Sequence, residues 1–109
     1  MDNESFKLKF GTRLQELRKS KKLTQEKLAE TVKIDIPNLS NIERGKRFVS
    51  SETLVKLAQA LNVDEKELFN FKHIKSRNEL VSEIIDIIKN ASDKDIIYFH
   101  KILTAYKEH

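Results

Sequence analysis

The feature that most constrains the fold is the apolar pattern between residues 25 and 44. Leu28 and Val32 lie at helical spacing. After a polar interval, Leu39 and Ile42 repeat that spacing. The whole set fits neither one continuous helix nor a strand, so it predicts two short helices that are joined by a tight turn and share one buried side. The outward face of the second helix is left to Pro37, Asn38, Ser40, Asn41 and Arg44.

The rest of the chain is also expected to be helical. Two Gly and one Pro in 109 residues leave little room for β-hairpins, and the β-branched residues fall at helical spacing. We therefore predict an all-α fold. Five helices are expected first, at about residues 6–19, 25–32, 36–44, 51–61 and 65–69, with N-caps at Ser5, Thr24, Asp35, Ser50 and Asp64.

Two further helices are predicted at about residues 77–89 and 93–107, and together they form a C-terminal hairpin. Each has an apolar arc wider than one stripe, which a two-helix hairpin cannot cover by itself. The N-terminal part of the chain, a second copy or another protein must cover the remainder. The expected contact residues are Ile84, Ile88, Ile96, Phe99, Leu103 and Tyr106. The sequence thus predicts two domains, at residues 6–70 and 76–107.

Basic residues are concentrated in the N-terminal part. The net charge of the chain is +4, but residues 7–47 contain twelve Lys or Arg and five Asp or Glu, a balance of +7. The remaining residues therefore sum to −3. Such a concentration suits a polyanion, with nucleic acid as the first candidate, although a solvated charged surface gives the same composition.

Enzymatic and metal-dependent functions find no support in the sequence. There is no Cys, and His73, His100 and His109 have no ligand spacing with one another. Asp93 and Asp95 are explained by the dipole of the helix that they begin. We find no nucleophile–base arrangement or phosphate loop, so we expect no enzyme, no metal site and no cofactor. No apolar run approaches the length of a membrane span, and we expect a cytoplasmic protein.

Three motifs in order resemble a known family. The segments LTQEKLAETV, NLSNIERGKR and SSETLVKLAQALNVDEKELF are similar to those of the Cro/C1-type (XRE) helix-turn-helix repressors. The resemblance covers about residues 6–70. It implies a five-helix, lambda-repressor-like DNA-binding domain whose third helix lies in the major groove of double-stranded DNA.

The resemblance also implies roles for individual residues. Arg18 and Glu43 match a recurring ion pair that joins the first and third helices. Gln25 matches a position that either contacts the phosphate backbone or supports side chains of the third helix. The positions that match DNA-contacting residues are Thr24, Gln25, Ile36, Pro37, Asn38, Ser40, Asn41, Arg44, Lys46 and Arg47.

Three departures from the family pattern stand out. Lys33 occupies the turn where most members have Gly, and a non-Gly residue in the left-handed region costs about 1 kcal/mol. Lys22 replaces a second common Gly. Both changes add positive charge, which either raises phosphate affinity or has no effect. Ile36 and Pro37 replace polar residues at the start of the third helix, so base preference should depend on Asn38 and Asn41, together with DNA shape.

The sequence leaves functions of different classes open. The first is a sequence-specific transcriptional regulator, a homodimeric repressor that reads a palindromic operator through residues 36–44. The second is a protein-interaction module, such as an antitoxin or phage-type switch, whose C-terminal hairpin binds a protein partner. A helix-turn-helix fold that has lost DNA binding is a third.

Overall fold

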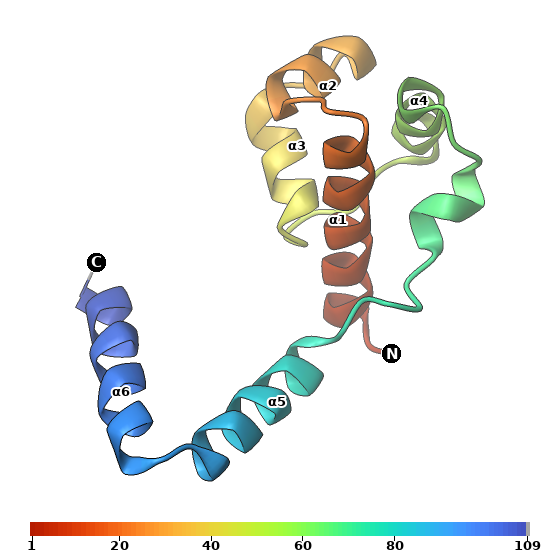
Figure 1. Ribbon diagram of the computed structural model, residues 1–109. Helices are drawn as coiled ribbons and strands as arrows, with labels where there is room; N and C mark the ends of the chain where they lie inside the picture. Colours follow the sequence, from red (N-terminus) through yellow and green to blue (C-terminus); the bar gives the residue numbers. More distant parts are fainter. Residues whose placement is uncertain (109) are drawn as a thin grey trace. The chain divides into compact units, whose positions relative to one another are not determined.

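The computed structural model describes residues 1–108, and every regular element in that range is a helix. The chain divides into two compact units, residues 1–76 and the residues from 77 onwards. The first unit contains α1 (Asn3–Ser20), α2 (Gln25–Val32), α3 (Ile36–Glu43), α4 (Ser51–Leu61) and the 3₁₀ helix η1 (Glu65–Phe69), and the second contains α5 (Arg77–Asn90) and α6 (Asp93–Glu108) (Figure 1). The predicted all-α fold is confirmed, with a 3₁₀ helix as the fifth element.

α1 is the central element of the first unit, where α3 and η1 pack against it (Figure 1). Its Phe10 and Leu14 are completely buried. Burying a side chain of this kind contributes about 1.5–3 kcal/mol. The other large, fully buried side chains come from every remaining helix of the unit, namely Leu28, Val32, Leu39, Ile42, Leu57, Leu61 and Leu68.

The close crossing of α1 and α3 depends on a glycine. A Cβ atom at Gly11 would overlap the carbonyl oxygens of Ile42 and Glu43. The apolar pattern does not indicate this role of Gly11, because Gly11 faces a helix distant in sequence.

The turn between α2 and α3 is left-handed at Lys33, with φ 61° and ψ 45°. The amides of Lys33 and Ile34 donate to the carbonyls of Glu30 and Ala29, which satisfies the end of α2. Lys22 has a φ of 59° in the turn before α2. Both lysines therefore occupy a conformation that favours glycine.

Local capping fixes most helix starts. The side chains of Thr24, Asp35 and Ser50 accept from the amides of residues 27, 38 and 53. α1 begins earlier than expected because Asp2, rather than Ser5, is its N-cap and accepts from the Ser5 amide at 2.7 Å.

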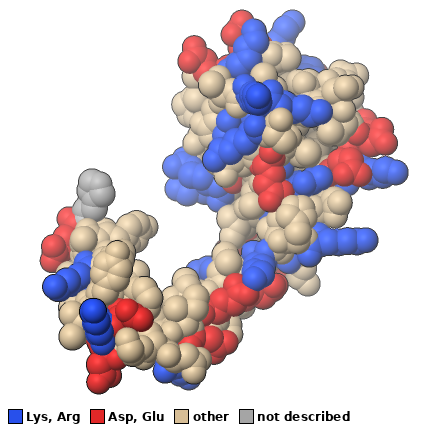
Figure 2. Space-filling model, in the orientation of Figure 1, with Lys and Arg blue, Asp and Glu red and all other residues tan. Residues whose placement is uncertain are grey.

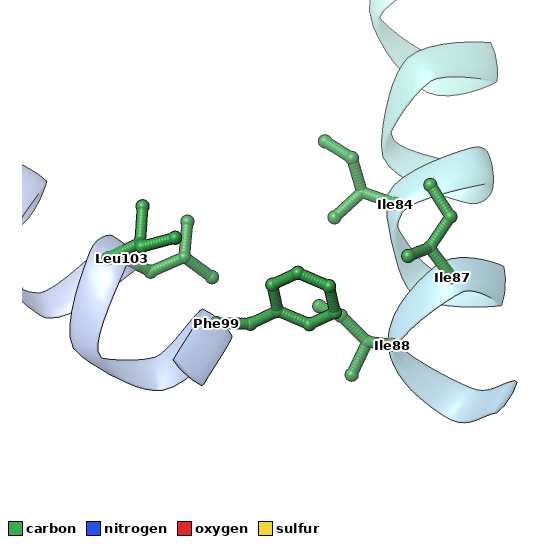
Figure 3. A pocket seen from close by; sticks show the side chains of 6 residues that line it. Ile84, Ile87, Ile88, Phe99 and Leu103 are labelled. Atoms are coloured by element: carbon green, nitrogen blue, oxygen red, sulfur yellow. The ribbon is translucent and has the colours of Figure 1, made fainter. Parts of the chain in front are cut away.

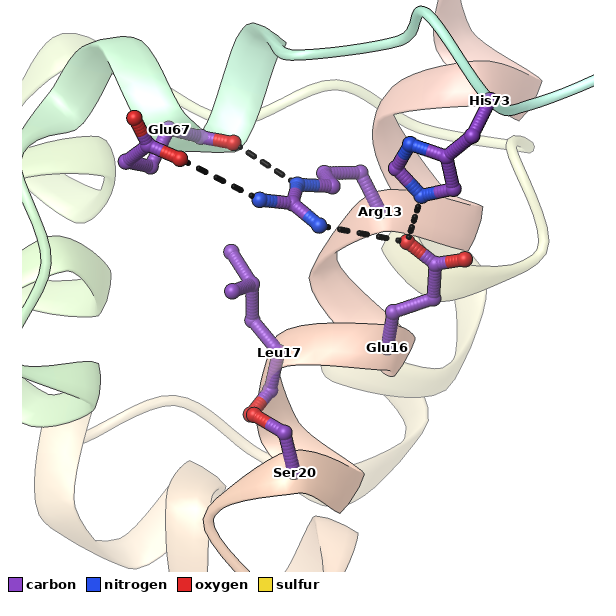
Figure 4. Close-up of polar contacts among 6 residues, drawn as sticks. All are labelled: Arg13, Glu16, Leu17, Ser20, Glu67 and His73. Carbon is purple, nitrogen blue, oxygen red and sulfur yellow. Dashed lines mark hydrogen bonds and ion pairs between the residues drawn. The ribbon is translucent and has the colours of Figure 1, made fainter.

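The segment after Asp64 is the second difference from expectation. It is a 3₁₀ helix, and Asp64 makes no side-chain capping bond. Both the carbonyl and the carboxylate of Glu67 instead bond to Arg13 of α1, at 2.8 and 3.3 Å. Arg13 also reaches Glu16, whose carboxylate is 2.7 Å from His73 (Figure 4). These contacts hold residues 67–73 against α1.

The second unit is built differently. Neither α5 nor α6 has a buried residue. The two helices meet at a short turn, where Ser92 accepts from the amide of Asp95. No helix in the described chain combines the length and the apolar character that a bilayer span requires.

Candidate nucleic-acid interface

α3 presents a mixed outer face on the first unit. Its inner side chains, Leu39 and Ile42, belong to the core. Along the outer face the side chains are exposed or half-buried, and they change from apolar to polar to basic in the order Ile36, Pro37, Asn38, Ser40, Asn41 and Arg44. The structure thus leaves these six sequence-predicted residues accessible, five of them on α3 and Arg44 directly after its last residue.

A buried ion pair sets the orientation of α3. The Arg18 guanidinium donates to both carboxylate oxygens of Glu43, at 2.7 and 3.1 Å, and their side chains are only 8% and 1% exposed. Arg18 also donates to the carbonyl of Leu23. A bidentate, buried pair of this kind is geometrically specific. It ties the end of α1 and the segment before α2 to the last residue of α3.

Gln25 extends the same network. Its side-chain nitrogen donates to Glu43 at 2.9 Å. Its side-chain amide is therefore turned towards the last residue of α3, while the side chain is only half-buried. Thr24 beside it is exposed, and its hydroxyl oxygen accepts from the amide of Lys27. The hydroxyl proton of Thr24 stays available to an outside acceptor.

The side chains of Asn38 and Asn41 differ in their freedom. Arg44 donates to the amide oxygen of Asn41 at 2.7 Å. Because arginine can only donate, this contact turns the nitrogen of Asn41 away from Arg44. The side-chain amide of Asn38 makes no hydrogen bond within the described chain, and only its backbone amide is bonded, to the carboxylate of Asp35. Asn38 can therefore present both a donor and an acceptor, whereas Asn41 offers mainly a donor.

The loop after α3 carries Lys46 and Arg47, which are both exposed. Gly45 starts the loop with a φ of 77°, and a Cβ there would press on the backbone of Leu8. Phe48 packs the end of this loop against α1, because the centroid of its ring lies 5.4 Å from that of Phe6 and 5.0 Å from that of Phe10. The sequence pattern did not predict this role of Phe48. The only signal was an aromatic residue within a basic loop.

Basic side chains surround this face. Lys22, Lys33, Lys46 and Arg47 are all exposed around the α2–α3 motif. Figure 2 shows Lys and Arg side chains gathered over the first unit, in the region where Figure 1 draws α2 and α3, with a few acidic side chains among them. Positive charge next to an accessible helix suits contact with phosphates on either side of a groove.

The hairpin forms a second, apolar surface. Six side chains line a cavity of about 240 Å³ between α5 and α6, namely Ile84, Ile87, Ile88, Phe99, Ile102 and Leu103 (Figure 3). Four of the six predicted contact residues of the hairpin therefore lie together. The other two do not line the cavity: Ile96 is half-buried and Tyr106 is 81% exposed.

No group of His, Asp or Glu within residues 1–108 is placed to hold a metal ion.

Comparisons with known proteins match the first unit most strongly. A family model described as a helix-turn-helix domain matches residues 11–74. The HTH-type transcriptional regulator ImmR of Bacillus subtilis (strain 168) is 34% identical over 95 residues, which cover 84% of this chain and 75% of that protein. The crystal structure of the restriction-modification controller protein C.AhdI from Aeromonas hydrophila is 47% identical. It has a TM-score of 0.56 and covers 57% of this chain and 94% of that chain.

The match to another solved structure covers most of the second unit as well. One chain in the structure of the SinR–SinI protein complex has a sequence 26% identical to this chain and a TM-score of 0.55. The match covers 92% of this chain and 99% of that chain. A match of that extent has to include part of α5 and α6, since residues 1–76 make up a smaller share of the chain.

Proposed function

The chain belongs to the Cro/C1-type (XRE) family of helix-turn-helix transcriptional regulators, and from this premise we propose that it represses transcription by occupying a palindromic operator as a homodimer. It is a DNA-binding regulator and not an enzyme. The proposal that it is an operator-binding repressor depends chiefly on one observation. A buried ion pair holds α3 in place, and the outer face of α3 is accessible. Its expected site of action is the cytoplasm, where it meets the DNA.

The proposed contacts divide by chemistry. α3 enters the major groove, which is about 12 Å wide and admits a helix. Asn38 and Asn41 read base edges, while Thr24, Lys46 and Arg47 bind phosphates. Gln25 and the Arg18–Glu43 pair hold α3 in position from its buried side. Phosphate contacts then supply most of the affinity, through counterion release, and α3 supplies selectivity.

The homodimer is supported by the uncovered apolar surface of the hairpin. No residue of α5 or α6 is fully buried, and the cavity side chains Ile84, Ile88, Phe99 and Leu103 carry no polar group. A second hairpin related by a two-fold axis would cover the same residues on both copies. Two α3 helices would then face two symmetric half-sites.

The test compares two variants on cognate and random duplex DNA over a range of salt concentrations. Asn41→Ala is expected to lose about 1–3 kcal/mol on the cognate duplex only, with the salt dependence unchanged. Lys46→Ala is expected to weaken binding to every sequence and to lower the salt slope by about 1. Lys66→Ala, an exposed lysine on η1, is the charge-matched control. Equal losses for Asn41→Ala on both duplexes would remove Asn41 from the reading role.

A second function is favoured by one comparison. The SinR–SinI structure is a complex of two different proteins, and it matches this chain beyond the first unit. As the second proposal, the hairpin binds a different protein and acts as a switch that controls the DNA-binding unit. Light scattering separates the two proposals: a stable dimer of this chain supports the repressor, and a monomer supports the partner-binding switch.

A further inference from the structure

The beginning of α3 displays apolar carbon at the proposed DNA-reading edge. Ile36 is the first residue of the helix and is 44% exposed, and the adjacent Pro37 is also exposed. Neither side chain belongs to the core of the first unit, although Ile34 just before them packs against it. These two residues therefore gain little from their own fold, and their side chains are available for an outside contact.

Ile36 and Pro37 exclude most features of a duplex as their ligand. Their side chains have no hydrogen-bonding atom and no charge, so they cannot bind a phosphate or the polar edge of a base. The polar side chains begin only at Asn38, whose side-chain amide has no hydrogen bond within the described chain. One feature of the major groove is apolar, namely the C5-methyl group of a pyrimidine, which thymine always carries and which cytosine carries only when methylated.

We propose that Ile36, backed by Pro37, is a specificity-determining residue that contacts the C5-methyl group of a thymine in each half-site. This inference rests on the proposed function. Asn38 favours thymine over methylated cytosine as the source of the methyl group. An asparagine with both its donor and its acceptor free pairs with adenine, and adenine is the partner of thymine. The contact gives the operator a sequence requirement at a position that has no hydrogen bond.

The experiment uses the full chain and the tightest-binding duplex recovered from random-sequence DNA. Each thymine of that duplex is replaced in turn by deoxyuridine, which removes only the C5-methyl group. At one position per half-site, this is expected to weaken binding about fourfold, the change expected from leaving one methyl-sized group out of contact. Ile36→Ala should bind the two duplexes equally, because the methyl group has lost its partner.

Two controls sharpen the experiment. Val55→Ala removes an apolar side chain of similar exposure, 41%, from α4, and it should keep the full effect of deoxyuridine. At the sensitive position, the base pair is also exchanged for cytosine–guanine with and without a C5-methyl group on the cytosine. Tighter binding to the methylated form would identify the methyl group itself as the contacted feature.

The possible failures are distinguishable. If a selected duplex is bound but no deoxyuridine weakens it, Ile36 does not read a methyl group, and the proposed repressor function stands. The same conclusion follows if Ile36→Ala is as sensitive to deoxyuridine as the unchanged protein. If no duplex is selected at all, the proposed function fails and this inference fails with it.

Discussion

Both units of this chain carry apolar residues at helical spacing, but only the first unit buries them. Phe10, Leu39 and Leu57 are wholly removed from solvent there. In the second unit, Ile84 and Leu103 are each more than half exposed. The first unit therefore closes its core within one copy, whereas the hairpin leaves exposed an apolar surface of the kind that marks an interaction site. The proposed function accordingly places DNA reading on the first unit and assembly on the hairpin.

The largest expected effect comes from the core of the first unit. Phe10→Ala should lower the free energy of unfolding by about 3–5 kcal/mol, because a fully buried aromatic ring is lost and a cavity remains. The loss should be the same at every protein concentration. Urea denaturation followed by circular dichroism measures it. A loss that varied with concentration would show that this core depends on a second copy.

The buried ion pair should come next. Glu43→Ala leaves the Arg18 charge buried without its partner, at an expected cost of about 3 kcal/mol in the free energy of unfolding. The double variant Arg18→Met with Glu43→Leu is the control, since it removes both charges and should regain much of that stability. A loss below about 1 kcal/mol for Glu43→Ala would mean that the pair does not hold α3 in place.

The hairpin should respond through association and not through the stability of the first unit. Phe99→Ala is expected to raise the dissociation constant of the dimer by about 30-fold, as loss of an aromatic side chain central to an interface does. Light scattering across a dilution series measures it. Lys101→Ala, an exposed polar position on α6, should leave the dimer unchanged. A Phe99→Ala protein that dimerises as before would place the interface elsewhere.

The smallest effect concerns the turn between α2 and α3. Lys33→Gly should raise the free energy of unfolding by about 1 kcal/mol, because glycine adopts the left-handed conformation of this position without strain. Lys56→Gly, in the middle of α4, is the matched control and should lower stability by about the same amount. If both variants changed the free energy of unfolding in the same direction, the strain assigned to Lys33 would be contradicted. Thermal unfolding followed by circular dichroism compares them.

Features that depend on neighbouring residues were predictable from the sequence. The caps at Thr24 and Asp35 and the left-handed turn at Lys33 each involve only a few consecutive residues. Asp2 and Ser5 are both good capping residues, so the pattern alone could not choose between them.

Features that depend on distant contacts were not predictable. Glu67 bonds to Arg13 on α1, and with that contact the segment forms a 3₁₀ helix. Phe48 and Gly11 owe their roles to α1 and α3 respectively, which only the folded chain brings near them. The apolar residues of α5 and α6 were visible in the sequence. That Ile84 and Phe99 line one cavity depends on how the turn between the two helices sets them against each other, which the sequence pattern does not give.

Selection of bound sequences from random duplex DNA tests the central claim most directly, because it reports on both units at once. We expect an enriched palindrome, in which each half-site is read by one α3 and the symmetry comes from paired hairpins. An enriched single half-site would contradict the assignment of the hairpin to a homodimer. No enrichment over random DNA would contradict the reading role of α3 itself.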